Sequence, residues 1–375
     1  IILAGCAAQA PAPVPAPVPA PAPVPAPAAA PAPAKPAPAT APAPTQAAQK
    51  EKVWNLKFHH NQVPGSPYQV RGHEPWIKDV ERATNGRVKI TIYPAQSIMK
   101  DRDALEGIKS RIADIAWFMP WQYPGNFDLA DAPMLPFMMP NGYIASQATW
   151  ALYQNTPEIQ AQFDKAGIKA LTIWSTDPYP FITTKKQIKT MDDVKGMKLR
   201  MVSGPPMEML KALGGVPIPL PMPDNYVAMK SGVTDGMAAP FEAIIGFRFY
   251  EVVKYYSLIP TTTAVNAYVI SKELWNEFPP DVQEQIMSVS GEKQAIRNGS
   301  DVFDYCREQL QGIVKKEGYE AVYFTPTKEE IEKWYAVAGK PVEEAWIARM
   351  ESLGHKAARK IVEDLKRFVK QFSTK

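Results

Sequence analysis

Val194-Lys195-Gly196-Met197-Lys198-Leu199-Arg200 and the later run Ser231-Gly232-Val233-Thr234-Asp235-Gly236 are the most informative stretches of this sequence. Thr190–Gly196 predicts a short helical turn, because Thr190 is a good N-cap, acidic residues follow it and Gly196 can close it. Residues 197–201 then alternate apolar and basic side chains, as is typical of a β-strand. Arg200 therefore lies near the carboxyl end of a predicted short strand.

Arg200 is the candidate ligand-binding residue of this strand. In open α/β sheets, ligands bind beyond the carboxyl ends of the strands. An arginine at that place can hold a carboxylate through two parallel hydrogen bonds. The local sequence also allows two other interpretations: a solvated surface arginine, or an arginine that pairs with Asp235.

Strand and helix patterns alternate outward from these stretches, which predicts an α/β protein whose folded part begins near Glu51. The predicted strands are Val53–Phe58, Arg87–Tyr93, Asp114–Phe118, Ala170–Trp174, Gly236–Ala239 and Ala264–Ser271. The predicted helices are Pro67–Thr84, Asp101–Ser110, Pro205–Leu213, Asn225–Ser231, Thr327–Leu353 and Lys356–Phe372. Between Pro280 and Glu317 apolar residues recur at helical spacing, which predicts one long helix.

In their order, these segments resemble the substrate-binding subunit of tripartite ATP-independent periplasmic (TRAP) transporters, the DctP-like extracellular solute-binding proteins of family 7. The resemblance covers about residues 52–370 and is carried by residues 54–58, 85–88, 112–116, 192–200, 213–217 and 226–236. It implies a two-lobe periplasmic binding protein fold with a hinge and a long helix that spans both lobes. Lobe I is expected at about 51–178 and 264–300, lobe II at about 179–263, and C-terminal helices at 301–375 packing on both.

The resemblance also implies the function. In that family the arginine that matches Arg200 binds the carboxylate of the substrate. The protein is then expected to bind an organic acid with high affinity in the periplasm and to deliver it to a small four-span and a large twelve-span membrane subunit. No enzyme or cofactor is expected, because the sequence has no G-x-S-x-G, glycine-rich phosphate loop or H-E-x-x-H motif.

Several aromatic and apolar residues near predicted strand ends are candidates for the wall of the pocket, although each can equally be a core residue. These candidates are Trp117, Met119, Trp121, Tyr179 and Phe241.

Two departures from better-known branches of the family bear on the ligand. The branches that bind sialic acid and C4-dicarboxylates carry a second arginine near the position of Pro180, and this chain has no arginine there. Those branches also carry Glu-Asn at the positions where this chain has Ala238-Ala239. These differences favour a monocarboxylate with an apolar or aromatic body, on which Phe241 can stack. Glu242 can accept a hydrogen bond from a ligand hydroxyl or ammonium group, or it can cap the next helix, which is slightly favoured.

His59-His60-Asn61 follows the first predicted strand. Adjacent residues of an extended chain point to opposite faces, which is poor geometry for chelation, so no metal site is expected. His60 or Asn61 can instead donate a hydrogen bond to the ligand.

The N-terminal residues predict a membrane-anchored form. Leu3-Ala4-Gly5-Cys6 resembles a bacterial lipobox, so residues 1–6 are interpreted as the remnant of a lipoprotein signal peptide with Cys6 as the lipidation site. Residues 7–50 are rich in proline and alanine and predict a disordered tether, with a docking ligand for a proline-binding domain as the alternative. No segment is long and apolar enough to span a bilayer, so the lipid is the expected contact with the membrane.

Charge and cysteine content narrow the possible classes of function. A formal net charge of +4 over 375 residues does not indicate a nucleic-acid-binding protein. Cys306 lies on the apolar stripe of a predicted helix, which favours a buried thiol over a reactive nucleophile. The alternative functions are a receptor for a tripartite tricarboxylate or ABC system, and a lipoprotein that senses a ligand.

Overall fold

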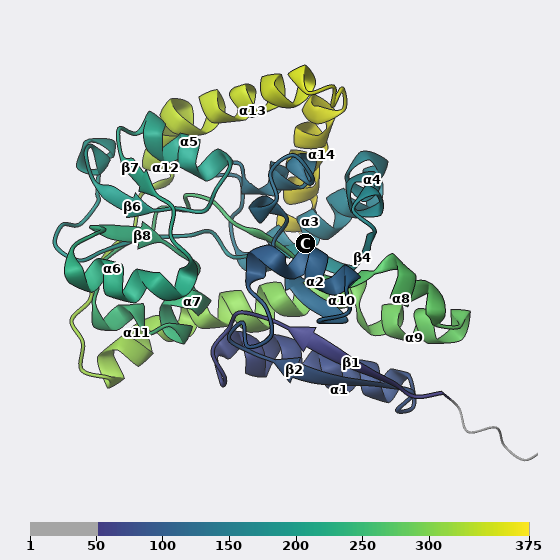
Figure 1. Cartoon of the computed structure of the whole chain (residues 1–375). Helices are drawn as coiled ribbons and strands as arrows, with labels where there is room; N and C mark the ends of the chain where they lie inside the picture. Colours follow the sequence, from purple (N-terminus) through teal and green to yellow (C-terminus); the bar gives the residue numbers. More distant parts are fainter. Residues whose placement is uncertain (1–51, 375) are drawn as a thin grey trace, which may run out of the picture. The chain divides into compact units, whose positions relative to one another are not determined.

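The computed structural model describes residues 52–374 (Figure 1). The predictions made for residues 1–6 and 7–50, including the lipidation of Cys6, therefore lie outside the described residues. Two β-sheets organise the described chain, and helices cover both of them.

The first sheet has five strands in the order β2-β1-β3-β10-β4. Strands β1, β2 and β3 run parallel, whereas β10 is antiparallel to both β3 and β4. Its strands are β1 (Trp54–His59), β2 (Val88–Tyr93), β3 (Ile115–Phe118), β4 (Ile168–Ser175) and β10 (Val265–Ser271). Every residue of β3 and β10 is buried, as the apolar runs in the sequence predict.

The second sheet has six short strands in the order β11-β9-β5-β8-β6-β7. Its strands are β5 (Phe181–Thr183), β6 (Lys198–Arg200), β7 (Val216–Ile218), β8 (Gly236–Ala238), β9 (Tyr255–Ser257) and β11 (Val322–Phe324). The two informative stretches of the sequence meet here, because Leu199 and Arg200 pair in parallel with Gly236 and Met237. The turn before β6 begins at Thr190, as predicted, and Thr190 forms a capping box with Asp193.

The strand directions bring the ends of many elements to one edge of each sheet. Parallel strands β6, β7 and β8 end together, so Arg200, the last residue of β6, lies at the same edge as Leu220 and Pro240, which follow β7 and β8. In the first sheet, Asn61 and Met119 follow the parallel strands β1 and β3. Such edges are where α/β proteins bind ligands.

Two extended segments, residues 176–180 and 258–264, connect the sheets and run beside each other. The Tyr179 amide donates to the Thr262 carbonyl at 2.8 Å, and the Thr176 amide donates to the Ala264 carbonyl at 3.0 Å. The connection is therefore a narrow two-stranded ribbon between two larger bodies, which is suited to bending.

The long helix predicted from Pro280 begins later than the sequence analysis expects. Ser290 (φ −101°, ψ −147°) and Gly291 (φ +55°) interrupt it, so α9 (Pro280–Val289) is a separate helix. A continuous helical run then extends through α10 (Gly291–Arg297), a π-helical segment (Asn298–Asp304) and α11 (Tyr305–Lys316). Since α10 packs against α3 and β4 while α11 packs against α7, this run touches both halves of the molecule (Figure 1).

The other helices cover the faces of the sheets. They are α1 (Glu74–Ala83), α2 (Ala104–Lys109), α3 (Gly142–Asn155), α4 (Pro157–Lys165), α5 (Pro205–Ala212), α6 (Asn225–Ser231), α7 (Phe241–Gly246), α8 (Lys272–Glu277), α12 (Lys328–Trp334), α13 (Lys340–Ser352) and α14 (Ala358–Ser373). At the C-terminus, α13 packs against α5 and α14 against α3, which ties the two halves together a further time (Figure 1). No helix in the described part of the chain combines the length and apolar character that crossing a membrane requires.

Candidate functional site

A cavity of about 1250 Å³ lies between the facing edges of the two sheets. It is lined from the first sheet by residues that follow β1 and β3, and from the second sheet by residues that follow β6, β7 and β8. Of the residues predicted from the sequence, those that line it are Asn61, Trp117, Met119, Trp121, Tyr179, Arg200 and Glu242.

Arg200 is buried in the wall of this cavity, with 3% of its surface exposed. Its Nε donates to the Leu220 carbonyl at 3.2 Å, and this hydrogen bond restrains the orientation of the guanidinium. Its Nη1 is buried without a hydrogen-bond partner in the described chain. Burial lowers the pKa of Arg200 to about 10, so the guanidinium is charged at neutral pH. Asp235 does not pair with it, since the Asp235 carboxylate accepts from the Lys198 amide at 2.8 Å.

Glu242 is the second buried ionisable group that faces the cavity, with 1% of its surface exposed. Burial raises the pKa of Glu242 to about 8, so this carboxyl group holds its proton at neutral pH. Its Oε1 has no hydrogen-bond partner within the described residues. The slightly favoured expectation that the Glu242 side chain caps the next helix is wrong. Pro240 is the N-cap of α7, and no side chain forms a capping hydrogen bond there.

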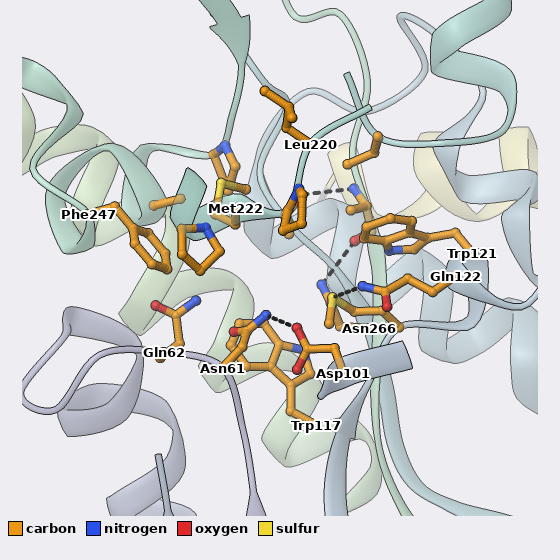
Figure 2. Close-up of a pocket in the computed structure, with 18 of the residues that line it drawn as sticks. Asn61, Gln62, Asp101, Trp117, Trp121, Gln122, Leu220, Met222, Phe247 and Asn266 are labelled. Atoms are coloured by element: carbon orange, nitrogen blue, oxygen red, sulfur yellow. Dashed lines mark hydrogen bonds between the residues drawn. The ribbon is translucent and has the colours of Figure 1, made fainter. Parts of the chain in front are cut away.

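Polar side chains from the first sheet form the opposite wall (Figure 2). The Asn61 amide donates to Asp101 Oδ2 at 2.7 Å and leaves its own Oδ1 unpaired. Gln62 and Asn266 lie in the same wall, and Gln62 Oε1 is also buried without a partner in the described chain. These oxygen atoms can accept hydrogen bonds from a bound molecule.

Aromatic and apolar groups complete the cavity. The Trp117 indole stacks on Tyr68, with 4.5 Å between ring centroids and 22° between the planes, so the wall has a rigid second layer. Leu220, Met222 and Phe247 face it from the second sheet and α7 (Figure 2). Apolar walls with a few placed polar groups are typical of small-molecule sites.

Tyr179 lies where the connecting ribbon meets the cavity, and 2% of its surface is exposed. Burial raises the pKa of its hydroxyl group well above the usual value, and the nearby Arg200 opposes this shift. Its backbone hydrogen bonds to Thr261 and Thr262 make it part of the connection as well as part of the wall.

Phe241 and His60 do not line this cavity, contrary to the sequence analysis. Phe241 lines a separate cavity and lies 5.7 Å from the Arg307 guanidinium, because consecutive helical residues point about 100° apart and Glu242 takes the inward position. The His60 ring is fully buried against His73, with 4.5 Å between ring centroids, and burial lowers its pKa to about 3. Asn61, the next residue, lines the cavity instead.

The structure also brings to the cavity residues that were not predicted from the sequence. Gln62 directly follows Asn61, so the end of β1 could have indicated it. Asn266 is the second residue of β10, and the first residues of an antiparallel strand share the edge with the ends of its neighbours. Leu220 and Met222 follow β7, a strand that the sequence analysis does not predict.

Comparisons with known proteins agree with this geometry. The model of the DctP family, described as bacterial extracellular solute-binding protein, family 7, matches residues 58–349. The C4-dicarboxylate-binding periplasmic protein DctP of Rhodobacter capsulatus is 24% identical over 250 residues, which are 65% of this chain and 73% of that protein.

Solved structures of TRAP solute-binding proteins share the fold. One from Rhodoferax ferrireducens, in complex with copurified benzoate, has a TM-score of 0.78 and 25% identity, covering 85% of this chain and 98% of its own. Another from Bordetella bronchiseptica, with bound (R)- and (S)-mandelate, has a TM-score of 0.76 and 23% identity over 85% of this chain and 99% of its own. Proteins of this kind are non-enzymatic components of transport systems. The chain belongs to family 7 of the bacterial extracellular solute-binding proteins, as a solute-binding protein of the TRAP type.

Proposed function

We propose that this protein binds a monocarboxylate with an apolar or aromatic body, and that Arg200 holds the carboxylate. The observation that carries this proposal is the buried Arg200 guanidinium, whose Nη1 lacks a partner in the described chain and which lies in a cavity walled by Trp117 and Trp121. A carboxylate satisfies the free N–H groups and the positive charge together.

The charges around the cavity support one carboxylate rather than two. The other basic side chains that line it, Lys100 and Arg102, are exposed at its rim. Glu242 contributes no positive charge, and Ala238 and Ala239 are small and buried. A second carboxylate inside the cavity would therefore meet no buried cation other than Arg200 among the lining residues, and its desolvation would be costly. The benzoate held by the relative from Rhodoferax ferrireducens is a ligand of this class.

A thermal-shift panel tests the ligand class. The panel compares benzoate, phenylacetate, hexanoate, phthalate and succinate at equal concentration, because stabilisation follows RT ln(1 + [L]/Kd). Benzoate or phenylacetate is expected to raise the melting temperature by about 4 °C or more when its concentration exceeds Kd by roughly 100-fold. Stabilisation by succinate and phthalate alone would overturn the monocarboxylate assignment.

We propose further that the acid-loaded protein docks on TRAP membrane subunits in the periplasm. The family match supports this role, because members of the family are periplasmic and work with such subunits. Pull-down with detergent-solubilised membrane subunits should retain the acid-loaded protein in preference to the acid-free protein. Equal retention of both forms would contradict delivery by a closed, loaded receptor.

We also propose that Cys6 carries a lipid anchor, on the strength of the sequence Leu3-Ala4-Gly5-Cys6 and the proline-rich segment after it. In cells, the Cys6→Ser variant should move from the membrane fraction to the soluble periplasmic fraction. Continued membrane association of that variant would argue against lipidation at Cys6.

A further inference from the structure

Two buried oxygen atoms without partners face the cavity from opposite sides. Glu242 Oε1 comes from α7, and Gln62 Oε1 comes from the segment after β1. Both side chains line the cavity, with 1% and 4% of their surfaces exposed. Burying an unpaired polar atom is unfavourable, so two such atoms in one cavity indicate a place built to receive a polar group.

Gly246, at the end of α7, shows that the two oxygen atoms converge. A Cβ atom placed on Gly246 would lie 3.4 Å from Glu242 Oε1 and 3.7 Å from Gln62 Oε1. Both oxygen atoms therefore border the same small volume, which the lack of a side chain at Gly246 leaves open. Phe247, the next residue, adds an apolar group beside it in the cavity (Figure 2).

The protonation of Glu242 decides which polar group suits this place. Burial raises the pKa of Glu242 to about 8, so at neutral pH its carboxyl group offers one O–H donor and a free acceptor oxygen. The Gln62 carbonyl oxygen adds a second acceptor. A hydroxyl group, which both donates and accepts, matches this set, whereas a second carboxylate has no proton to offer the acceptors.

We propose that Glu242 and Gln62 bind a hydroxyl group on the body of the ligand, so that the receptor selects hydroxylated organic acids. The ligand then has two fixed points, its carboxylate at Arg200 and its hydroxyl group between Glu242 and Gln62. This inference rests on the proposed function, because it takes for granted that an organic acid occupies the cavity. It adds that Glu242 and Gln62 determine specificity.

A different role for Glu242 and Gln62 is a direct contact that holds the two sides of the cleft together, called a latch below. Glu242 and Gln62 would then hydrogen-bond to each other when the cleft closes, whichever acid is bound. A latch weakens or strengthens all ligands by the same factor, whereas a hydroxyl site changes only the ratio between hydroxylated and plain acids.

Isothermal titration calorimetry on matched acids separates these roles. The probes are benzoate and its three monohydroxy isomers, together with phenylacetate and its ring-hydroxylated isomers, at pH 7. For the wild-type protein, at least one hydroxylated isomer is expected to bind about tenfold more tightly than its parent acid, the effect of one or two buried hydrogen bonds.

Three variants are matched to this comparison. Glu242→Leu and Gln62→Leu remove one partner each, and Gly246→Ala fills the shared volume with a methyl group at ordinary contact distances. Each should bring the ratio of the two dissociation constants close to one. Glu242→Gln keeps a donor and an acceptor and should retain part of the preference. A cooperative thermal unfolding transition shows that each variant is folded.

Three results would overturn the inference. They are a wild-type protein that binds every hydroxylated isomer no better than its parent, a Glu242→Leu variant with the wild-type ratio, and an equal loss of affinity for all acids in that variant. In each of these cases the wild-type protein still binds the parent acid, so the proposed function stands. If no carboxylate binds the wild-type protein at all, the proposed function fails and this inference falls with it.

Discussion

Arg200 and Glu242 are buried polar side chains that each keep one hydrogen-bonding atom without a partner in the described chain. In the absence of a ligand, such groups reduce stability, because their desolvation is not compensated. The Leu220 carbonyl holds the Arg200 side chain through Nε, and α7 positions the backbone of Glu242. A ligand therefore meets groups that are already oriented, so little ordering entropy opposes binding.

Glu242 should make stability depend on pH. Its pKa is about 8 in the folded protein against 4.5 as the ordinary value, so the folded state retains a proton that the unfolded chain releases. Its contribution to stability is complete below pH 4.5 and is lost progressively as pH rises toward 8. Glu242→Gln should therefore raise the free energy of unfolding at pH 8 by roughly 2–5 kcal/mol and change it little near pH 4.5.

Urea denaturation across this pH range measures the effect. Glu284→Gln, on an exposed position of α9, is the control and should follow the wild-type curve. If Glu242→Gln shows the same dependence on pH as the wild-type protein, Glu242 does not carry its proton in the folded state.

At the scale of elements, strand direction determines which residues meet. The site combines the ends of the parallel strands β1, β3, β6, β7 and β8 with the start of the antiparallel strand β10. The helical run through α10 and α11 holds the two sheets from one side, and it begins at Gly291 because the chain there adopts φ +55°. A glycine is the residue that accepts this conformation at least cost.

Gly291→Ala should destabilise the protein by about 1–2 kcal/mol, for two reasons. An alanine at φ +55° is strained, and its Cβ would lie 3.0 Å from Trp150 Cζ2. Gly312→Ala is the matched comparison, because Gly312 lies inside α11 with open space around its Cβ, and it should stabilise by up to about 1 kcal/mol. Thermal or urea unfolding distinguishes the two, and equal effects would contradict this account of the helix boundary.

Local patterns in the sequence predict most of the elements but not all of the site. The Thr190 cap, the alternation before Arg200 and the buried run of β3 follow from residue type and period, and the structure contains them. The periodicity of apolar residues could not show that Phe241 points away from the cavity while Glu242 points into it. This outcome depends on the residue at which α7 begins. The break at Ser290 was also missed, since apolar spacing continues across it.

At the scale of the whole molecule, the cavity lies between two bodies that are joined by a ribbon, residues 176–180 and 258–264. The helical run through α10 and α11 and the C-terminal helices also connect them. We expect the ribbon to act as a hinge and the cleft to close over the acid. Small-angle X-ray scattering should then show a radius of gyration that falls by a few per cent on addition of a bound acid such as benzoate. The Arg200→Met variant should show no such change, and an unchanged radius in the wild-type protein at saturation would contradict closure.

The central claim is that Arg200 anchors the carboxylate, and isothermal titration of benzoate tests it most directly. Arg200→Met removes a buried charge of which one nitrogen is unpaired in the described chain, so the variant should stay folded. Its affinity for benzoate should fall by at least about 100-fold, because two charged hydrogen bonds are lost. Arg102→Met, at the exposed rim, should bind benzoate as the wild-type protein does. Wild-type affinity in a folded Arg200→Met variant would contradict the account.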